Sequence, residues 1–284
     1  MKKAVLVIFT VLFGFCILFA GCEKKSEEGT VEGSEDGSES MAVSGSFTLK
    51  PGVLSVGVEI GYPPMEYLDS DGVTPVGFDI SMAEALAEKM GLEVEFIDTA
   101  WAGIFAGVDT DKYDCIISSV TINEPRLRAH NFSIPYIQNT LAIVLPVDST
   151  LNILSPDDLE GRSVAYQEET ISDDFMTELG EAGLAFTPRE YDKVIYCFND
   201  LELGRVDVIM IDLLVAYEYV AQAADKFKIV WQGGEEEFGI CMKKGNNALT
   251  YAVDNALNEL FEEGTMLSIS YEIFDMDLVS AVRQ

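Results

Sequence analysis

One short stretch of the chain, residues 114–136, combines three hydroxyl side chains with an arginine at close spacing. Ser118, Ser119 and Thr121 directly follow an apolar run that predicts a short strand, and Arg126 comes next, at a turn or helix start. Hydroxyls, backbone N–H groups at a strand end and a planar guanidinium fork are suitable donors for a carboxylate. The stretch therefore predicts a carboxylate receptor. The alternative is a solvated loop with a surface arginine, since such junctions often contain these residue types.

The same stretch resembles the ligand-carboxylate motif of the amino-acid-binding proteins of bacterial ABC importers, the solute-binding family 3 type. The positions that match in register are Asp114, Ile116, Ile117, Ser118, Thr121, Ile122, Arg126, Phe132, Ser133, Pro135 and Tyr136. One departure is Pro125, which stands where the family usually has Glu. Further matches cover most of residues 53–275, so the chain is identified as a member of this family. The resemblance implies that Arg126, Ser119 and Thr121 take the α-carboxylate of an amino acid.

Asp212 follows the apolar run 206–211 and precedes a predicted helix. By the resemblance it pairs with the α-ammonium of the ligand, a group that needs a charged acceptor when it leaves water. The alternative reading is a helix N-cap, and both roles are compatible.

Tyr62 and Trp101 match the aromatic positions that enclose the ligand side chain in this family, and aromatic faces suit both aliphatic stems and cations. Their alternative is ordinary packing at a lobe edge. Glu59 ends the first predicted strand, where relatives often have an acid that reaches the ligand side chain, which hints at a cationic or amide-bearing amino acid. Ser118 matches a position that often binds through its backbone carbonyl.

The loop 167–172 departs from the family pattern. Glu169 replaces a glycine and Ile171 replaces a hydroxyl residue, whereas Thr170 is retained as a ligand-binding candidate. We expect the carboxylate to depend more on Arg126, and Glu169 to face the cleft and favour a cationic group.

Asp79 and His130 are left out of the predicted site. Asp79 precedes a predicted helix and is interpreted as its N-cap. His130, the only histidine, is interpreted as structural or exposed. The folded body has three cysteines, Cys115, Cys197 and Cys241. They are interpreted as buried thiols, because Cys115 and Cys241 lie in apolar runs and the odd count and wide spacing give no disulfide framework. One disulfide between two of them remains an alternative. We expect no metal and no cofactor, because no Cys-x-x-Cys or histidine cluster is present.

The folded body alternates strands and helices, a βαβ pattern that predicts parallel sheets with helices on both faces. Strands are expected at 53–59, 92–97, 141–145, 163–166, 206–211, 227–230 and 238–242. Helices are expected at 80–90, 172–179, 194–203, 213–222, 248–261 and 265–274. The resemblance implies an α/β fold of the periplasmic-binding-protein-like type II, with two lobes, a hinge of two crossovers and a ligand cleft between the lobes. Lobe 1 is expected at 47–139 plus 233–284, lobe 2 at 140–232, and the crossovers near 139–140 and 231–234.

The N-terminus has the pattern of an export signal, residues 1–21: two lysines, then an uncharged, mostly apolar run. The run ends in Leu-Phe-Ala-Gly before Cys22, which resembles the lipobox of bacterial lipoproteins and implies lipidation of Cys22. The alternative is an uncleaved membrane helix. Residues 22–46 are expected to form a disordered, lipidated tether, because they are rich in Ser, Gly and Glu.

The formal net charge of −31 limits the possible partners. It argues against nucleic acid, whose binding needs clustered Lys and Arg, and against electrostatic docking on an anionic membrane. Attachment should therefore rest on the lipid. The resemblance implies a monomer on the extracytoplasmic face of the cell membrane, with an amino acid as ligand and a membrane ABC permease as partner. We expect hinge closure to capture the ligand, and no enzymatic activity. The alternatives are an enzyme on the same fold, such as a cyclohexadienyl dehydratase, and a ligand-sensing module.

Overall fold

A computed structural model describes residues 47–283 of the chain. The predicted signal, the lipidation site Cys22 and the predicted tether lie outside the described residues. No helix within 47–283 is long and apolar enough to cross a membrane.

The first of two large sheets contains five strands in the order β4-β1-β5-β12-β6. Their bounds are Val53–Val58 for β1, Glu93–Asp98 for β4, Cys115–Ile116 for β5, Asn131–Phe132 for β6 and Cys241–Met242 for β12. β1 runs parallel to β4 and β5, whereas β12 runs antiparallel to β5 and β6. The parallel strands therefore bring the carboxyl ends of β1 and β5 to the same edge.

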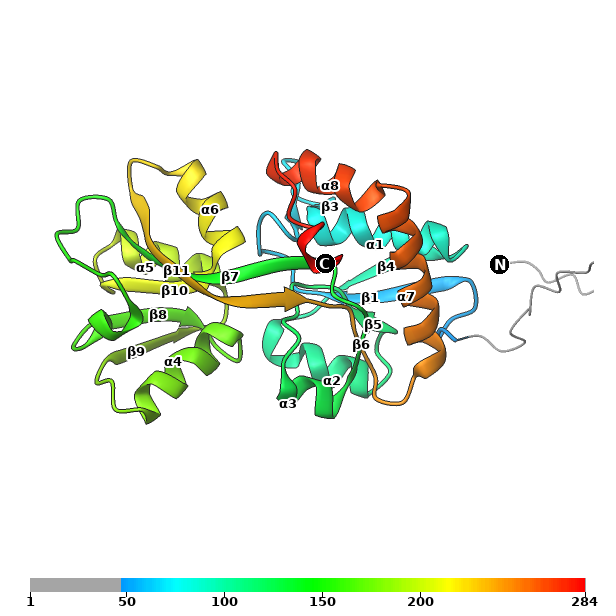
Figure 1. Ribbon diagram of the computed structural model, residues 1–284, viewed down its shortest axis with the longest axis horizontal. Coiled ribbons are helices and arrows are strands. Elements are labelled where there is room, and N and C mark those ends of the chain that lie inside the picture. The colour runs from blue at the N-terminus through cyan, green and yellow to red at the C-terminus, as the bar shows by residue number, and fades with distance from the viewer. Residues whose placement is uncertain (1–46, 284) are drawn as a thin grey trace, which may run out of the picture. The chain divides into compact units, whose positions relative to one another are not determined.

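Five helices belong to the first sheet, and together they form what we call the first lobe (Figure 1). Their bounds are Phe78–Lys89 for α1, Ile104–Asp109 for α2, Glu124–Ala129 for α3, Asn247–Glu262 for α7 and Thr265–Phe274 for α8. Side chains of neighbouring strand residues point to opposite faces, so Cys115 packs in the core beneath α1 and α7 while Ile116 packs with α2. The sheet is thus buried on both faces.

The start of α1 is fixed by backbone contacts to the preceding loop. The N–H groups of Phe78 and Asp79 donate to the carbonyls of Pro64 and Met65 at 3.0 and 2.9 Å. Gly77 is the N-cap and has a φ of 126°, and a Cβ there would overlap the Met65 carbonyl. The prediction that Asp79 caps this helix is therefore wrong. Asp79 lies in the first turn and is fully buried, because its carboxylate serves tertiary partners instead.

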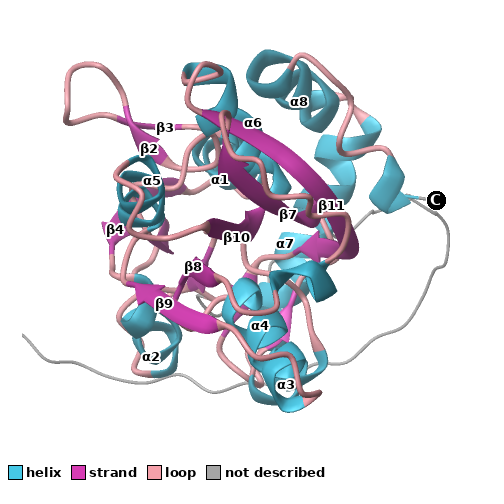
Figure 2. Cartoon of the chain, turned by 90° about the vertical axis from the view of Figure 1, so that its left-hand side faces the viewer, coloured by secondary structure: helices cyan, strands magenta, loops and turns pink. Residues whose placement is uncertain are grey.

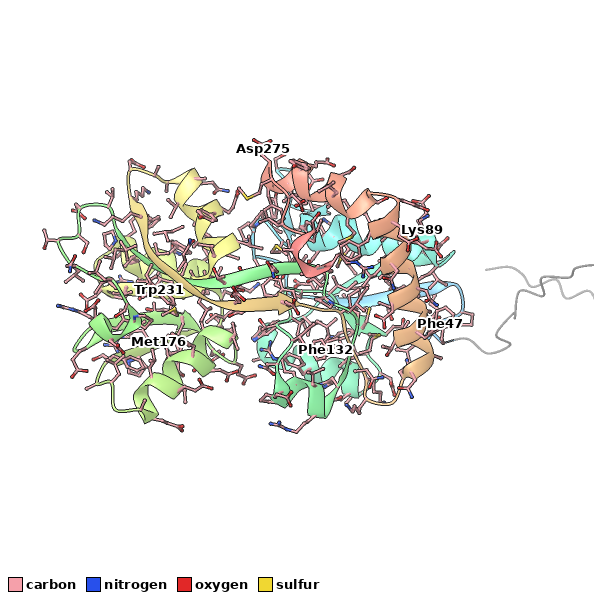
Figure 3. All side chains as sticks on the ribbon, in the orientation of Figure 1. Phe47, Lys89, Phe132, Met176, Trp231 and Asp275 are labelled. Carbon is pink, nitrogen blue, oxygen red and sulfur yellow. The ribbon has the colours of Figure 1, made fainter. Side chains whose placement is uncertain are left out.

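The second large sheet has the order β11-β7-β10-β8-β9. Its strands are β7 (Ile137–Pro146), β8 (Ser163–Gln167), β9 (Thr187–Tyr191), β10 (Val208–Asp212) and β11 (Phe227–Phe238). Its helices are α4 (Ile171–Glu181), α5 (Val194–Glu202) and α6 (Leu213–Gln222). The core on the α4 face includes Met176 and Trp231, both labelled in Figure 3, whereas α5 and α6 cover the other face. These elements form the second lobe (Figure 2).

β7 and β11 form an antiparallel ribbon that runs from one lobe to the other (Figure 1). The crossovers expected near 139–140 and 231–234 fall within this ribbon, and its register is irregular between Ile229 and Trp231 and between Gly233 and Glu235. The two lobes, each a sheet with helices on both faces, confirm the predicted α/β fold class. Two strands expected at 227–230 and 238–242 are instead one long strand, β11, and the short β12.

Some elements were not predicted. β9, with the sequence TPREY, is a largely exposed edge strand, so it lacks the apolar alternation that marks a strand. The hairpin of β2 (Tyr67–Leu68) and β3 (Pro75–Val76) and the short helix α2 were also missed. The remaining elements are short 3₁₀ turns at Trp101–Gly103, Pro156–Leu159 and Ala281–Arg283.

Candidate functional site

A narrow cavity, with about 310 Å³ of empty space when its open mouth is included, lies at the carboxyl ends of strands from both lobes. It is lined by Glu59, Tyr62, Glu66, Trp101, Ser118, Ser119, Thr121, Arg126, Gln167, Thr170, Ile171 and Asp212. Open α/β sheets bind their ligands outside the carboxyl ends of strands, which is the position of this cavity. The structure therefore brings all nine ligand-binding residues expected from the sequence to one cavity, together with Glu66, Gln167 and Ile171.

Arg126 is held at the cavity by α3 and by two aromatic rings. The side chain of Asn123 caps α3 by accepting from the Arg126 N–H at 2.9 Å. The guanidinium carbon lies 5.6 Å from the centroid of the Trp101 ring and 5.2 Å from that of Phe105, within cation–π range. Nη1 donates to the Thr121 carbonyl at 3.0 Å. A guanidinium has five N–H donors, so its planar fork retains donors for a carboxylate.

The three hydroxyl residues beside Arg126 differ in what they can offer. Ser119 Oγ is buried and has no hydrogen-bond partner within the described part of the chain. Ser118 Oγ already donates to Glu66 Oε1 at 2.7 Å and accepts from the Glu59 N–H at 3.0 Å. Thr121 Oγ1 donates to Glu236 Oε2 at 3.2 Å. Among these hydroxyls, Ser119 Oγ is thus the one without a hydrogen bond to another described residue.

Asp212 ends β10 on the opposite wall. Its backbone forms the N-cap of α6, but its side chain makes no capping bond. Oδ2 accepts from the Tyr62 hydroxyl at 2.6 Å, while Oδ1 is buried and unpartnered among residues 47–283. Burial raises the pKa of Asp212 to about 6, although the Tyr62 and Asn139 hydrogen bonds and the charge of Arg126 oppose the rise. A cation placed at Oδ1 would supply the missing partner and restore the ionised form.

Glu59 lies at the end of β1, where the cavity is closed by groups of the second lobe. Its Oε2 accepts from Gln167 Nε2 at 2.8 Å, and its Oε1 is 3.4 Å from the Trp101 N–H. Burial raises the pKa of Glu59, and the bond from Gln167 partly offsets this. Trp101 Nε1 donates to the carbonyl of Glu169 at 2.9 Å, and Thr170 Oγ1 donates to the Gln167 carbonyl at 2.7 Å.

The expectation for Glu169 is not met. Its side chain is exposed and is not part of the cavity wall; its backbone, with a φ of 59°, contributes only the carbonyl that Trp101 contacts. Glu66 is instead the third carboxyl residue of the cavity wall, beside Glu59 and Asp212. Sequence reasoning missed Glu66 because it lies in an apolar loop with no spacing signal. Gln167 could have been found, since it ends a strand as Asp212 does.

The residues left out of the predicted site lie behind it. Asp79 Oδ2 accepts from the Ser119 N–H at 2.7 Å and from the Tyr136 hydroxyl at 3.1 Å. His130 is buried, and its Nε2 is 3.2 Å from Asp109 Oδ1, which agrees with a structural role. Cys115, Cys197 and Cys241 are all buried free thiols, so the open question of a bridge between them is answered.

The chain is similar to several known proteins. Residues 54–276 match the bacterial extracellular solute-binding proteins, family 3. The chain is 30% identical to the L-cystine-binding protein TcyJ of Escherichia coli over 228 residues, covering 80% of this chain and 84% of that protein. It is 27% identical to the L-cystine-binding protein TcyA of Bacillus subtilis over 280 residues, which covers 98% and 99% of the two chains.

Solved structures of binding proteins are also similar to this chain. An ancestral arginine-binding protein bound to arginine aligns with a TM-score of 0.75 at 34% identity, covering 78% of this chain and 98% of that one. An ancestral amino-acid-binding protein, AncCDT-1, described as a precursor of cyclohexadienyl dehydratase, aligns with a TM-score of 0.73 at 31% identity, covering 78% and 96%. Since the family match spans most of the described body and includes both walls of the cavity, the chain belongs to the bacterial extracellular solute-binding proteins of family 3.

Proposed function

We propose that this protein is the amino-acid-binding component of an ABC importer and that it holds its ligand between Arg126 and Asp212. The observation that carries the proposal is the pairing, in one cavity, of a guanidinium fork with the unpartnered Oδ1 of Asp212. The fork suits an α-carboxylate, with Ser119 Oγ as a further donor, and Asp212 suits an α-ammonium. Tyr62 and Trp101 form the apolar part of the wall.

The charge of the cavity favours a polar or cationic amino acid. Three carboxyl groups, Glu59, Glu66 and Asp212, face one guanidinium. A ligand with one carboxylate and two cationic groups complements this set better than a neutral amino acid, because it compensates buried negative charge. Relatives named for arginine are consistent with this, whereas L-cystine, the ligand in the name of other relatives, carries two carboxylates beside its two ammonium groups and is polar without net charge.

Capture by hinge closure is the proposed mechanism. Hydrogen bonds between the lobes join Tyr62 to Asp212, Gln167 to Glu59, Trp101 to the Glu169 carbonyl and Lys193 to the Ile60 carbonyl. A ligand that contacts both walls adds to these bonds only when the lobes are close, so it stabilises the closed form selectively. The lobe boundaries are proposed at 47–139 plus 233–284 and at 140–232, with the ribbon β7–β11 as hinge.

The protein is proposed to deliver its ligand, as a monomer, to a membrane permease while a lipid on Cys22 holds it at the extracytoplasmic face. Replacing Cys22 with alanine should move the protein from the membrane fraction to the soluble fraction. Retention of the Cys22→Ala protein in membranes would contradict the lipid anchor without affecting the ligand site.

Thermal unfolding in the presence of amino acids tests the ligand class. The chain from residue 22 onward, with Cys22→Ala, is unfolded and refolded to remove any bound ligand and is then heated with each common amino acid and with L-cystine. A ligand at 100 times its dissociation constant stabilises the folded form by about 2.7 kcal/mol. We expect stabilisation by arginine, lysine, histidine, glutamine or cystine. Stabilisation by apolar amino acids alone would contradict the role of Glu59, and stabilisation by none would contradict amino-acid binding.

A dehydratase is the second candidate, and one observation favours it. The Glu59 carboxyl is buried in the cavity and has a raised pKa, which suits an acid or base, and AncCDT-1 shares the fold. Incubating the protein with a cyclohexadienyl carboxylic acid would decide between the two, since turnover that is lost in Glu59→Gln would establish the enzyme.

A further inference from the structure

Two buried carboxyl groups lie directly behind the hydroxyl side of the cavity. Glu66, 1% exposed, precedes β2 and forms part of the cavity wall, whereas Asp79, with no exposure, lies one layer deeper in the first turn of α1. Neither carboxyl forms an ion pair in the part of the chain that the structure describes. Buried carboxyls without a cation partner are costly, so their environment must compensate them in another way.

Each member of the pair holds one of the two serines of the carboxylate receptor. Glu66 Oε1 accepts from Ser118 Oγ at 2.7 Å, and Asp79 Oδ2 accepts from the Ser119 N–H at 2.7 Å. Ser119 has a φ of 51°, a conformation that costs energy for a residue other than glycine and that needs such support. Its N–H is held by Asp79, while its Oγ is buried without a hydrogen bond to another described residue, in a serine that lines the cavity. The carboxyl pair therefore sets the shape of the receptor.

The two remaining oxygens, Glu66 Oε2 and Asp79 Oδ1, are buried and receive no N–H or O–H donor from the rest of the described chain. The two carboxyl groups lie near enough for each to affect the pKa of the other. A hydrogen bond between them needs a proton, because two carboxylates are acceptors only. One proton between Glu66 and Asp79 thus gives both oxygens a partner.

The surroundings favour retention of that proton. Burial raises the pKa of Asp79 to about 7, opposed by its bonds from Ser119 and Tyr136. Burial raises the pKa of Glu66 well above its usual range, and the negative charge of Asp79 adds to the rise. The other titratable or charged groups that face the pair are Glu59 at the end of β1, Tyr62 in the preceding loop, Tyr136 before β7 and Asp212 at the end of β10, with Arg126 across the cavity. The negative charges of Glu59 and Asp212 raise the pKa of Glu66 further.

We propose that Glu66 and Asp79 share one proton and act as positioning residues for Ser118 and Ser119, so that ligand affinity falls when the proton is lost. Two ionised carboxylates in contact repel each other, which displaces the serines that they hold. The second negative charge also opposes the carboxylate of a ligand bound at Ser119. This inference rests on the proposed amino-acid site and adds a pH dependence to it.

Glu66→Gln tests the proposal without removing the contacts. A glutamine is isosteric, its amide N–H can donate to Asp79, and its oxygen can accept from Ser118, so it imitates the protonated pair at every pH. Affinities for L-arginine and L-cystine are measured by calorimetry between pH 6 and 9. We expect wild-type affinity to fall by up to about tenfold per pH unit above the pKa of the pair, and the Glu66→Gln protein to lack this fall. Titration of the probe itself changes the affinity of both proteins equally, so it cancels in the ratio of the two affinities.

Asp254→Asn is the matched control. Asp254 on α7 is also a partly buried carboxyl with a raised pKa, and it accepts from the Ile134 N–H at 2.8 Å, but it takes no part in the site. The control should keep the wild-type pH profile. Asp79→Asn is the second variant; it also leaves a single carboxyl, so it should again flatten the profile.

A measurement without any ligand separates this proposal from the site on which it rests. The infrared spectrum at neutral pH should contain the carbonyl band of a buried protonated carboxyl in the wild type that Glu66→Gln lacks. Equal pH profiles in the two proteins, or equal infrared bands, would overturn the shared proton while leaving the amino-acid site intact. If neither probe binds, the amino acid that stabilises the protein most in the thermal screen replaces them. Absence of binding by every amino acid, at any pH, would overturn the proposed function and this inference together, even if the infrared band were present.

Discussion

At the scale of single residues, the cavity contains two groups whose hydrogen-bonding capacity is only partly used. Arg126 donates one N–H to a backbone carbonyl, and one carboxylate oxygen of Asp212 accepts from the Tyr62 hydroxyl. Each is fixed by its neighbours, and Arg126 still has donors and Asp212 an acceptor that a ligand could use. Preorganised groups of opposite charge lose little freedom on binding, which is why a small cavity can hold an amino acid tightly.

Replacing Arg126 with alanine should weaken binding of the amino acid found in the thermal screen by roughly 30-fold to several thousand-fold, equivalent to about 2–5 kcal/mol. Arg126→Lys should recover little, because an ammonium lacks the planar fork that matches a carboxylate. Isothermal calorimetry measures both. Arg128→Ala is the control: Arg128 belongs to the same helix but is exposed and only 3.7 Å from Glu124. Wild-type affinity in Arg126→Ala would exclude Arg126 from the site.

At the scale of elements, the start of α1 links a backbone constraint to the site. The helix can begin where it does only because Gly77 accepts a positive φ and lies against the Met65 carbonyl. The first turn then delivers Asp79 to Ser119. A change at Gly77 should therefore reach the ligand through this turn.

Gly77→Ala should destabilise the protein by more than the roughly 1–2 kcal/mol expected from a positive φ alone, since the added methyl also overlaps the Met65 carbonyl. Gly91→Ala provides the comparison: Gly91 follows the same helix with a φ of 67°, and a Cβ there meets nothing within 4 Å. Urea unfolding of both variants isolates the cost of the overlap. Equal losses of unfolding free energy in the two variants would show that the loop 61–66 moves away from the added methyl group at little cost. Ligand affinity should fall in Gly77→Ala only.

At the scale of the whole molecule, a net charge of −31 coexists with buried carboxyls that face one another. Asp212, Asp79 and Glu236 have pKa values raised by burial to about 6, 7 and 8, and the pKa values of Glu59 and Glu66 are raised as well. Each group binds its proton more tightly in the folded chain than in the unfolded chain. Where the folded chain holds more protons, the free energy of unfolding decreases as the pH rises.

These groups therefore stabilise the ligand-free protein fully only below the pKa values of the unfolded chain, about 4, and this contribution is lost as the pH rises through the folded pKa values of about 6, 7 and 8. Thermal unfolding at a series of pH values measures this. Glu236→Gln should remove part of the decrease between pH 6 and 8 while keeping an acceptor for Thr121 and Asn139. A melting temperature that rises over this range would contradict the raised pKa values.

Sequence signals were sufficient to predict a site residue where its position depends on a single strand. Asp212 and Glu59 end strands, and their position at the cavity follows from strand direction alone. Asp79 and Glu66 illustrate the opposite case, because their roles depend on contacts with Ser119 and Ser118, 40 and 52 residues away in the chain. A helix-start aspartate is more often a cap, and only tertiary packing turned this one inward. The exposure of Glu169 likewise depends on its left-handed backbone conformation. The glutamate, which stands where the family has a glycine, did not indicate that conformation.

The chain has two tryptophans, and they lie in different surroundings. Trp101 spans the cavity, with Arg126 over its ring and its indole N–H on the Glu169 carbonyl, whereas Trp231 stacks on Phe175 inside the second lobe at 6.3 Å between ring centroids. Light emitted by Trp101 should therefore depend on whether the lobes touch, whereas Trp231 lies at a hinge crossover and would add a second signal. With Trp231 exchanged for phenylalanine, the protein becomes its own optical sensor, and the opening and closing of the cleft can be timed in a stopped-flow instrument without any attached dye.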